Sequence, residues 1–169
     1  MVRSGRPELD PIDLGIATAL QADGRRPFTR IARDLGVSEA AVRQRVARLE
    51  ASGSLQIVAV TDPAALGFRT TAMLGIKVTP GAAGQVAAAL ERLPEVAYLV
   101  LVAGSFDLLA EVVCEDNDHL LRWLDDELGA VDGVNAVETF VYLRLVKESY
   151  TWSLAGATPQ PEAEGGRAG

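Results

Sequence analysis

Cysteine and histidine are almost absent from this sequence, which has one of each, Cys114 and His119, among 169 residues. A single cysteine excludes an internal disulfide, and the two residues together are too few for a metal cluster of the usual ligands. Cys114 follows two valines in a strand-like run, so we interpret it as a small core residue. We therefore expect no cofactor, no metal site and no catalytic residue.

Long apolar runs are also missing, although 49% of the residues are hydrophobic. A transmembrane helix needs about 20 consecutive apolar residues, and the opening segment, MVRSGRPELDP, lacks the apolar stretch of a signal peptide. We therefore expect a cytoplasmic protein that has no membrane partner and has enough apolar residues to bury a core.

The net charge of −7 argues against nucleic-acid binding until its distribution is considered. Residues 1–50 contain nine arginines against seven acids, whereas residues 51–169 contain seven basic residues against sixteen acids. Residues 25–50 alone have a net charge of +4. A local basic patch on an acidic protein can bind a phosphate backbone while the remainder resists promiscuous binding. The partition predicts two modules with different purposes.

Residues 28–50, FTRIARDLGVSEAAVRQRVARLE, have the pattern of two short helices joined by a turn at Gly36. Ser38 suits the N-cap of the second helix. A preceding helix is expected to start with Asp10 as N-cap and Pro11 at the first helical position. This pattern, in which a glycine-containing turn joins a helix to a second helix with a polar exposed face, indicates a helix-turn-helix. The second helix of that motif enters the major groove of DNA. The predicted core of this unit is Ile12, Ile16, Leu20, Ile31, Leu35, Val42, Val46 and Leu49.

The rest of the chain alternates between strand and helix periodicity. LQIVAV (55–60) predicts a wing or hinge strand. The order that follows is β-α-β-β-α-β, a split βαβ unit, which predicts a four-stranded antiparallel sheet with both helices on one face. The expected strands are 70–78, 96–103, 108–114 and 134–146, and the expected helices are 80–93 and 118–128.

The second face of this sheet is predicted to be apolar as well, because Leu99, Leu101, Leu109, Phe140 and Tyr142 are assigned to it. Two such half-covered sheets can cover each other, so we expect at least a homodimer closed about a two-fold axis.

The segments LDPID, QADGR, LGVSEAAVRQRVARLEASG and DPAALGF, followed by PEV, GSFD and a terminal VK, resemble the Lrp/AsnC (feast/famine) transcriptional regulators over residues 9–150. The resemblance implies an α+β chain: an N-terminal winged helix-turn-helix followed by a ferredoxin-like βαββαβ regulatory domain. It also implies dimers that often assemble further into octamers, and a small-molecule effector, commonly an amino acid. The expected parts are a flexible arm (1–8), the helix-turn-helix domain (9–53), a wing or hinge and linker (54–68), the effector-binding and oligomerisation domain (69–150) and a disordered tail (151–169).

The candidate DNA contacts lie on or near the second helix of the motif. Arg can pair with guanine, Gln with adenine and Glu with cytosine, but several of these side chains can equally touch only phosphate, or simply be solvated. Base contact is favoured for Arg43 and Gln44. Arg45 matches an arginine that recurs in the family, and it is alternatively a structural ion pair with Asp34 or Glu50. The full set is Ser38, Glu39, Ala40, Arg43, Gln44, Arg45, Arg48, Arg25, Arg26 and Arg30.

Two positions depart from the family pattern. Arg26 replaces a usual apolar residue and Pro27 a usual Ser or Thr cap. Pro27 still suits a helix start, and Arg26 adds a cation beside the recognition helix.

The candidate effector site is the turn Gly104-Ser105-Phe106-Asp107, which matches the family's Gly-x-x-Asp loop. There Gly104 would allow close approach of backbone and Asp107 would hold an ammonium group. The alternative is a turn whose Asp bonds backbone. Phe106 and Leu108 suggest an apolar rim and a hydrophobic or aromatic effector. Weaker candidates are Tyr98, Glu138 and Thr139.

Two other classes of function fit the sequence less well. An enzyme similar to the sirohaem decarboxylases would be expected to use histidines, and this chain has one. A ligand-sensing oligomer whose helix-turn-helix contacts only protein conflicts with the basic patch, because interface centres are depleted in charge. We therefore expect double-stranded DNA and a small effector as partners.

Overall fold

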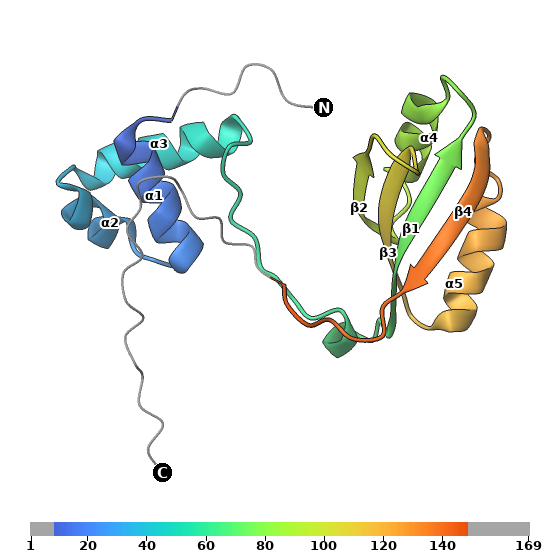
Figure 1. The fold of residues 1–169 in the computed structure, drawn as a ribbon. Helices are drawn as coiled ribbons and strands as arrows, with labels where there is room; N and C mark the ends of the chain where they lie inside the picture. Colours follow the sequence, from blue (N-terminus) through green and yellow to red (C-terminus); the bar gives the residue numbers. More distant parts are fainter. Residues whose placement is uncertain (1–8, 149–169) are drawn as a thin grey trace, which may run out of the picture. The chain divides into compact units, whose positions relative to one another are not determined.

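The computed structural model describes residues 9–148 (Figure 1). The chain divides into two compact units: among the described residues, the first contains residues 9–59 and Glu148, and the second is Val60–Lys147. The first contains three helices, and the second contains a four-stranded sheet with its helices. No helix in this part of the chain is both long enough and apolar enough to cross a membrane.

The first unit consists of α1 (Pro11–Ala22), α2 (Phe28–Leu35) and α3 (Glu39–Ala51). The predicted start of α1 is confirmed. The backbone N–H of Asp13 donates to Oδ1 of Asp10 over 2.8 Å, and the N–H of Asp10 donates to Oδ2 of Asp13 over 3.2 Å. This reciprocal capping box satisfies two N–H groups that a helix start would otherwise leave unpaired.

The turn between α2 and α3 follows from two local residues. Gly36 has a φ of 67°, the left-handed conformation that favours glycine at a helix end. The N–H of Val37 donates back to the carbonyl of Ala32 over 2.9 Å. Ser38 then caps α3 as predicted, its Oγ accepting the N–H of Ala41 over 3.2 Å. These contacts set the direction in which α3 leaves the turn.

The core of the first unit contains most of the residues predicted for it. Ile12 and Leu35, which were also predicted, are only half-buried and pack at its edge. The buried apolar residues are Ile16, Leu20, Ile31, Ala32, Val42, Val46 and Leu49.

The predicted wing or hinge strand at residues 55–60 is wrong, because this segment forms no strand within the described chain. Its apolar alternation is real, but a strand also requires a neighbour to which its backbone can hydrogen-bond. Ile57, Val58 and Val60 are exposed by 44%, 69% and 57%. A single 3-10 turn, η1 (Ala64–Leu66), follows.

The second unit has the predicted β-α-β-β-α-β order. The sheet order is β2-β3-β1-β4 with antiparallel neighbours throughout, which confirms the ferredoxin-like arrangement. Its elements are β1 (Thr70–Val78), α4 (Ala83–Leu90), β2 (Val96–Leu101), β3 (Leu108–Cys114), α5 (Asn117–Trp123), the π-turn η2 (Leu124–Leu128) and β4 (Val134–Val141).

Several predicted boundaries in this unit need correction. The cap of α5 is Asp116 and not Asp118, because Asp116 has extended backbone and its Oδ1 accepts the N–H of His119 over 2.7 Å. The last strand ends at Val141 rather than at residue 146: Val141 pairs with Ala72, and one further backbone hydrogen bond, from the N–H of Tyr142 to the carbonyl of Thr71, brings the chain to the start of β1 at Thr70. Strand β2 likewise ends at Leu101 and α4 at Leu90.

One face of the sheet is covered by both helices, as predicted. Buried residues of α4 and α5 pack into the same core as alternate residues of β1 and β3. The main members are Leu74, Ile76, Val86, Leu90, Leu108, Ala110, Val112, Cys114, Leu120 and Trp123. Cys114 is therefore a core residue, and burial raises the pKa of its thiol.

The face opposite the helices, called the open face below, carries Met73, Tyr98, Leu109, Glu111 and Phe140. Directly paired residues in antiparallel strands point to the same side, and the pairs Met73–Phe140, Met73–Glu111 and Tyr98–Glu111 define this set, with Leu109 paired to Gly75.

The predicted assignment of Leu99 and Leu101 to the open face is wrong. They pair with Ala110 and Leu108, which are buried on the helix side. A register shift between Val96 and Tyr98 brings Tyr98 to the open face, where it is 54% exposed.

Candidate DNA-binding and effector sites

The exposed side of α3 is the first candidate site. Val42, Val46 and Leu49 form its buried stripe, and at 3.6 residues per turn the positions opposite that stripe are Ala40, Gln44, Ala47 and Ala51. All four are exposed. Arg43 and Arg48 lie on either side of this line. The sequence patterning thus correctly predicted which residues leave the core.

Arg43 is held along the surface of its own unit. Its Nη2 lies 2.6 Å from Oε1 of Glu39, one turn earlier, and its guanidinium carbon lies 5.5 Å from the ring centroid of Phe28. The Arg43 side chain is nevertheless 66% exposed. An exposed pair of this kind is worth less than about 1 kcal/mol, so the side chain is free to exchange Glu39 for another anion.

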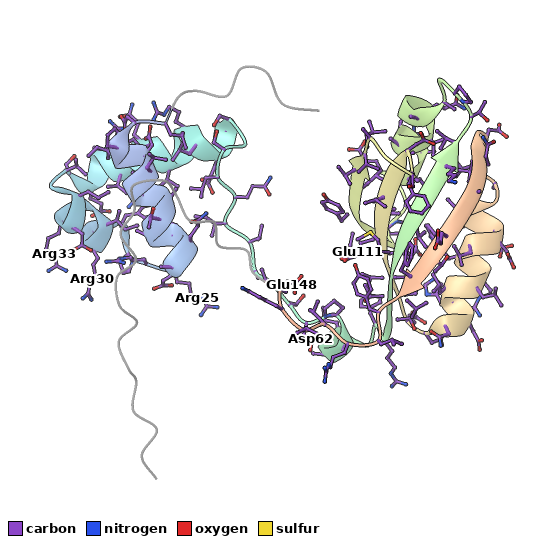
Figure 2. All side chains as sticks on the ribbon, viewed as in Figure 1. Arg25, Arg30, Arg33, Asp62, Glu111 and Glu148 are labelled. Carbon is purple, nitrogen blue, oxygen red and sulfur yellow. The ribbon has the colours of Figure 1, made fainter. Side chains whose placement is uncertain are left out.

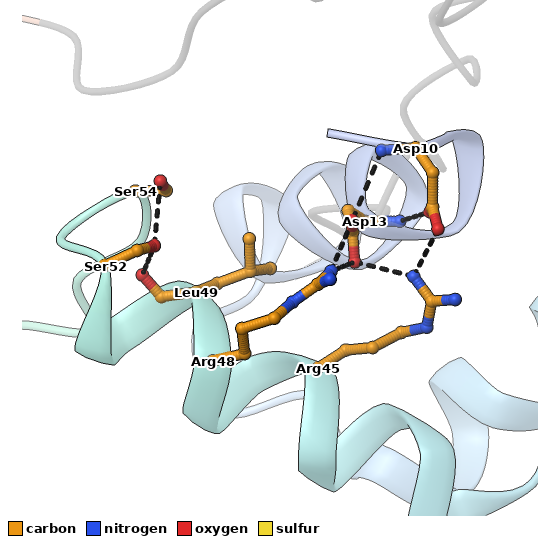
Figure 3. Close-up of polar contacts among 7 residues, drawn as sticks. All are labelled: Asp10, Asp13, Arg45, Arg48, Leu49, Ser52 and Ser54. Atoms are coloured by element: carbon orange, nitrogen blue, oxygen red, sulfur yellow. Dashed lines mark hydrogen bonds and ion pairs between the residues drawn. The ribbon is translucent and has the colours of Figure 1, made fainter. Parts of the chain in front are cut away.

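Arg45 and Arg48 both bind carboxylates at the start of α1 (Figure 3). Nη1 of Arg45 lies 2.6 Å from Oδ2 of Asp10 and 2.8 Å from Oδ1 of Asp13. Nη2 of Arg48 lies 2.7 and 2.6 Å from the two carboxylate oxygens of Asp13. The proposed partners of Arg45, Asp34 and Glu50, are therefore wrong. The ion pair itself exists, because the packing of α1 on α3 brings the capping box beside these arginines.

The Asp13 carboxylate is the centre of this cluster, and its side chain is completely buried. Burial alone would raise the pKa of Asp13, but hydrogen bonds from Arg45, the Asp10 backbone and Arg48 outweigh it and the pKa is lowered. The Asp13 N–H, followed by Arg45, lowers the pKa of Asp10. The two carboxylates in turn raise the pKa of Arg45. The capping box therefore also fixes two side chains of the recognition helix.

Arg26 is likewise partnered, by Asp34 of α2. Its Nε is buried and has no hydrogen-bond partner among the described residues. Arg26 lines a shallow hollow of about 300 Å³ together with Asp23, Pro27 and Arg30. The hollow lies where the chain enters α2.

Three further arginines of this unit, Arg25, Arg30 and Arg33, are exposed. Figure 2 shows them extending away from the ribbon along one side of the three-helix unit. Within residues 9–148, none of their side chains has an ion pair or hydrogen bond. Unpaired exposed guanidinium groups of this kind are available to phosphates without breaking an existing contact.

The second candidate site is the loop between β2 and β3. Gly104 and Ser105 are exposed, and nothing lies within 4 Å of a Cβ built on Gly104. Oδ2 of Asp107 accepts the N–H of Val78 over 2.8 Å, and the N–H of Asp107 donates to the carbonyl of Ile76 over 2.9 Å. The carboxylate thus bonds backbone of the neighbouring strand and still reaches the surface.

The ring of Phe106 lies over Gly75 in the middle of β1. A Cβ on Gly75 would be 2.6 Å from Cζ of Phe106. The same ring meets Phe140 of β4 edge to face, with centroids 6.4 Å apart. Leu108, predicted to share an apolar rim with Phe106, is completely buried on the helix side. That prediction is wrong, because the two residues belong to opposite faces of the sheet.

The structure brings only some of the weaker candidates near this loop. Glu138 pairs with Gly75 and so lies on the open face beside Phe106. Thr139 pairs with Leu74 and faces the helix side, while Tyr98 is on the far edge strand β2.

Sequence reasoning missed the roles of Asp13 and Gly75. Asp13 was identified only as part of a helix cap, and nothing in its spacing indicated contacts to residues 32 and 35 positions away. A glycine in the centre of a strand is a signal for close approach by another group, and this signal at Gly75 was available.

The two units together define a class of protein: a helix-turn-helix transcriptional regulator with a separate ligand-binding domain. The AsnC-type helix-turn-helix domain matches residues 9–50, and the Lrp/AsnC ligand-binding domain matches residues 71–152. The chain belongs to the Lrp/AsnC family of transcriptional regulators.

Individual relatives agree with this assignment. The HTH-type transcriptional regulator FL11 of Pyrococcus furiosus is 32% identical over 142 residues, covering 83% of this chain and 93% of that protein. The crystal structure of the leucine response regulatory protein LrpA of Mycobacterium tuberculosis is 29% identical, with a TM-score of 0.76 over 83% of this chain and 96% of that one. AsnC of E. coli, 24% identical, shares the fold with a TM-score of 0.75, over 86% of this chain and 99% of that one.

Proposed function

We propose that this regulator binds specific double-stranded DNA sites through α3 and that a small effector, an amino acid, changes its DNA affinity or its assembly. The carrying observation is the exposed side of α3 next to unpaired arginines on the same unit. A cytoplasmic protein is proposed on the same basis, because its target is the DNA.

The DNA-binding surface has two parts. In a helix-turn-helix protein the second helix enters the major groove while neighbouring elements contact the sugar-phosphate backbone. Here the groove-facing candidates are Ser38, Glu39, Ala40, Arg43 and Gln44. Arg25 and Arg30 are proposed to contact phosphate, and Arg26 joins them at the hollow before α2. Arg45 and Arg48 are proposed to act mainly by fixing α3 on α1, with Arg48, half exposed, adding positive charge near the backbone.

The effector is proposed to bind at the loop of Gly104, Ser105, Phe106 and Asp107. An exposed glycine allows close approach, and the Asp107 carboxylate has a free side on which an ammonium group can bind. Glu138 adds a second carboxylate on the same face. The relative LrpA is named for its response to leucine, which motivates amino acids as the class to test.

Assembly is proposed to occur through the open face. It exposes large apolar groups, including Tyr98 at 54% and Phe140 at 45%, beside the half-buried Leu109. An apolar sheet face of this kind is covered when a second copy packs on it, giving a two-fold homodimer, and dimers can assemble further toward an octamer. Since Phe106 lies on the open face and also belongs to the effector loop, effector binding and assembly are proposed to be linked.

The test is a mobility-shift titration of the full chain on the DNA upstream of its own gene. A scrambled duplex of the same length is the control, and both are titrated at near-physiological salt with and without a pool of amino acids. Sedimentation of the same samples reports the assembly state. A specific shift that changes with the pool supports the whole proposal, and dividing the pool identifies the effector.

Two results would contradict parts of the proposed function. A specific shift with no response of affinity or assembly across the full panel removes the effector proposal and leaves the DNA-binding one. Equal binding to the specific and scrambled duplexes, or no shift with folded protein, removes sequence-specific DNA binding. That result would favour a ligand-sensing oligomer.

A further inference from the structure

Some polar side chains on α3 already have hydrogen bonds or ion pairs within their own unit and others do not. This difference indicates which of them can contact bases. Glu39 and Arg43 are paired with each other. Arg45 and Arg48 are bound to the capping box of α1. Gln44 alone among the polar residues at the centre of the exposed side has no hydrogen bond or ion pair from its side chain within residues 9–148.

The position of Gln44 on α3 also suits contact with base edges. It lies opposite the buried stripe of Val42, Val46 and Leu49, in the first half of α3. That half is the part of a recognition helix that contacts base edges. Its neighbours on the same line, Ala40 and Ala47, are small and exposed. Short side chains on either side allow the helix backbone to approach the groove floor closely, so that a glutamine can reach base edges.

We infer that Gln44 is the specificity-determining residue and that this regulator selects an adenine, in an A·T-containing core, at the base pair that Gln44 faces. The carboxamide of glutamine can donate to N7 and accept from N6 of adenine in the major groove, and alanine methyl groups contact the methyl group of thymine. Ala40 and Ala47 are placed for such contacts. The inference rests on the proposed DNA-binding function and deepens it by naming the class of sequence.

Arg43 and Arg48 take a different role in this arrangement. Both lie to the sides of the Ala40–Gln44–Ala47 line, where the walls of the groove present phosphates. Arg48 would have to leave two contacts to the buried Asp13 carboxylate before it could reach a base, which removes one of the two arginines that neutralise that buried charge. Arg43 is held by an exposed pair with Glu39 and by its contact with the Phe28 ring, and it can exchange Glu39 for a phosphate. These arginines add affinity without choosing the sequence.

The test is selection of bound duplexes from a randomised library by the full-length wild type, by Gln44→Arg, by Gln44→Ala and by Arg43→Ala. Circular dichroism first verifies that the melting transitions agree, which is expected for exposed positions. The wild type should enrich a motif with adenine at one defined base pair of its A·T core. Gln44→Arg should select guanine in place of adenine at that base pair, since arginine pairs bidentately with guanine. Gln44→Ala should lose about tenfold to hundredfold in discrimination at that base pair only.

Arg43→Ala serves as the matched control on the same helix. It should weaken binding to all sequences alike and leave the selected motif unchanged. An identical motif selected by the wild type and Gln44→Arg overturns the inference while the proposed function stands. A motif that Arg43→Ala changes and Gln44→Arg does not would assign the readout to Arg43. Failure of the wild type to enrich any motif would instead remove the proposed function itself.

Discussion

The aromatic ring of Phe106 occupies the space that a side chain on Gly75 would need. A Cβ at Gly75 would lie 2.6 to 2.7 Å from three ring carbons of Phe106. The contact joins the loop between β2 and β3 to the middle of β1 on the open face, and Phe140 of β4 closes it from the side. The candidate effector loop and the candidate assembly surface therefore share one aromatic side chain.

Replacing Gly75 with alanine should displace the Phe106 ring and destabilise the protein by about 1–3 kcal/mol, the usual cost of overpacking a close contact. Chemical denaturation measures the loss. The matched control is Gly104→Ala in the same loop, where nothing lies within 4 Å of the added carbon, and it should change the stability by less than about 0.5 kcal/mol.

The displaced ring can be tested directly with a double mutant. In the Phe106→Ala background, Gly75→Ala should cost much less, because the atoms that it meets are gone. If Gly75→Ala lowers the stability equally in both backgrounds, the contact with Phe106 is not the reason why position 75 requires glycine.

Replacing Asp107 with asparagine separates its two possible roles. The asparagine oxygen can still accept the N–H of Val78, so the loop and the unfolding midpoint should be preserved. The negative charge is lost, and the affinity for an amino-acid effector should fall by tenfold or more, because an ammonium group loses a charge-assisted hydrogen bond. Calorimetric titration with the effector found in the mobility-shift experiment measures the change.

Asp107→Ala provides the comparison, because it removes both the charge and the acceptor and should lower stability as well. Unchanged effector affinity in Asp107→Asn would identify Asp107 as a turn residue only.

Asp13→Asn should destabilise the first unit by about 2 kcal/mol, since hydrogen bonds to charged groups contribute about 1.5–3 kcal/mol. The substitution preserves the size of the side chain, but it removes the charge that binds Arg45 and Arg48. Denaturation followed by circular dichroism measures the loss. Glu50→Gln, at an exposed acid of the same unit, is the control and should have little effect.

The same carboxylate predicts a dependence on pH. The pKa of Asp13 in the folded chain is lower than its ordinary value of 3.8, so the unfolded chain binds more protons just below that value. The stabilisation is therefore fully present above the ordinary pKa and is lost as pH falls through the folded-state pKa. The stability difference between wild type and Asp13→Asn should be constant near neutral pH and shrink below about pH 4. A difference that stays constant into that acid range would contradict the ion-pair account.

Arg30→Ala should weaken binding to specific and scrambled DNA by similar factors and reduce the slope of log affinity against log salt by about 0.9, the value for one phosphate contact. Arg30 is exposed and lines the hollow before α2. Fluorescence anisotropy across a salt series measures both quantities. The control is Arg92→Ala, an exposed arginine of the second unit. A slope that Arg30→Ala leaves unchanged would show that this side chain is only solvated.

The sequence by itself determined the elements whose signals are local. Asp10 and Pro11 specify the start of α1, and Gly36 with Ser38 specifies the turn into α3, because capping and left-handed backbone depend on neighbours within a few residues. Alternating apolar residues gave strands β1 and β3 at their observed bounds. The helix-turn-helix, the sheet topology and the exposed side of α3 all follow from such periodicities.

Only the tertiary structure decided which charged groups are engaged and which faces the sheet residues take. Arg48 and Asp13 are 35 residues apart, and their contact depends on how α1 packs on α3. A register shift near Val96 places Leu99 on the helix side, and the apolar alternation of residues 55–60 produces no strand within the described part of the chain. The contact of the Phe106 ring with Gly75 depends on the pairing of β1 with β3. Such contacts depend on packing and register between distant segments, which the periodicity of a local sequence does not specify.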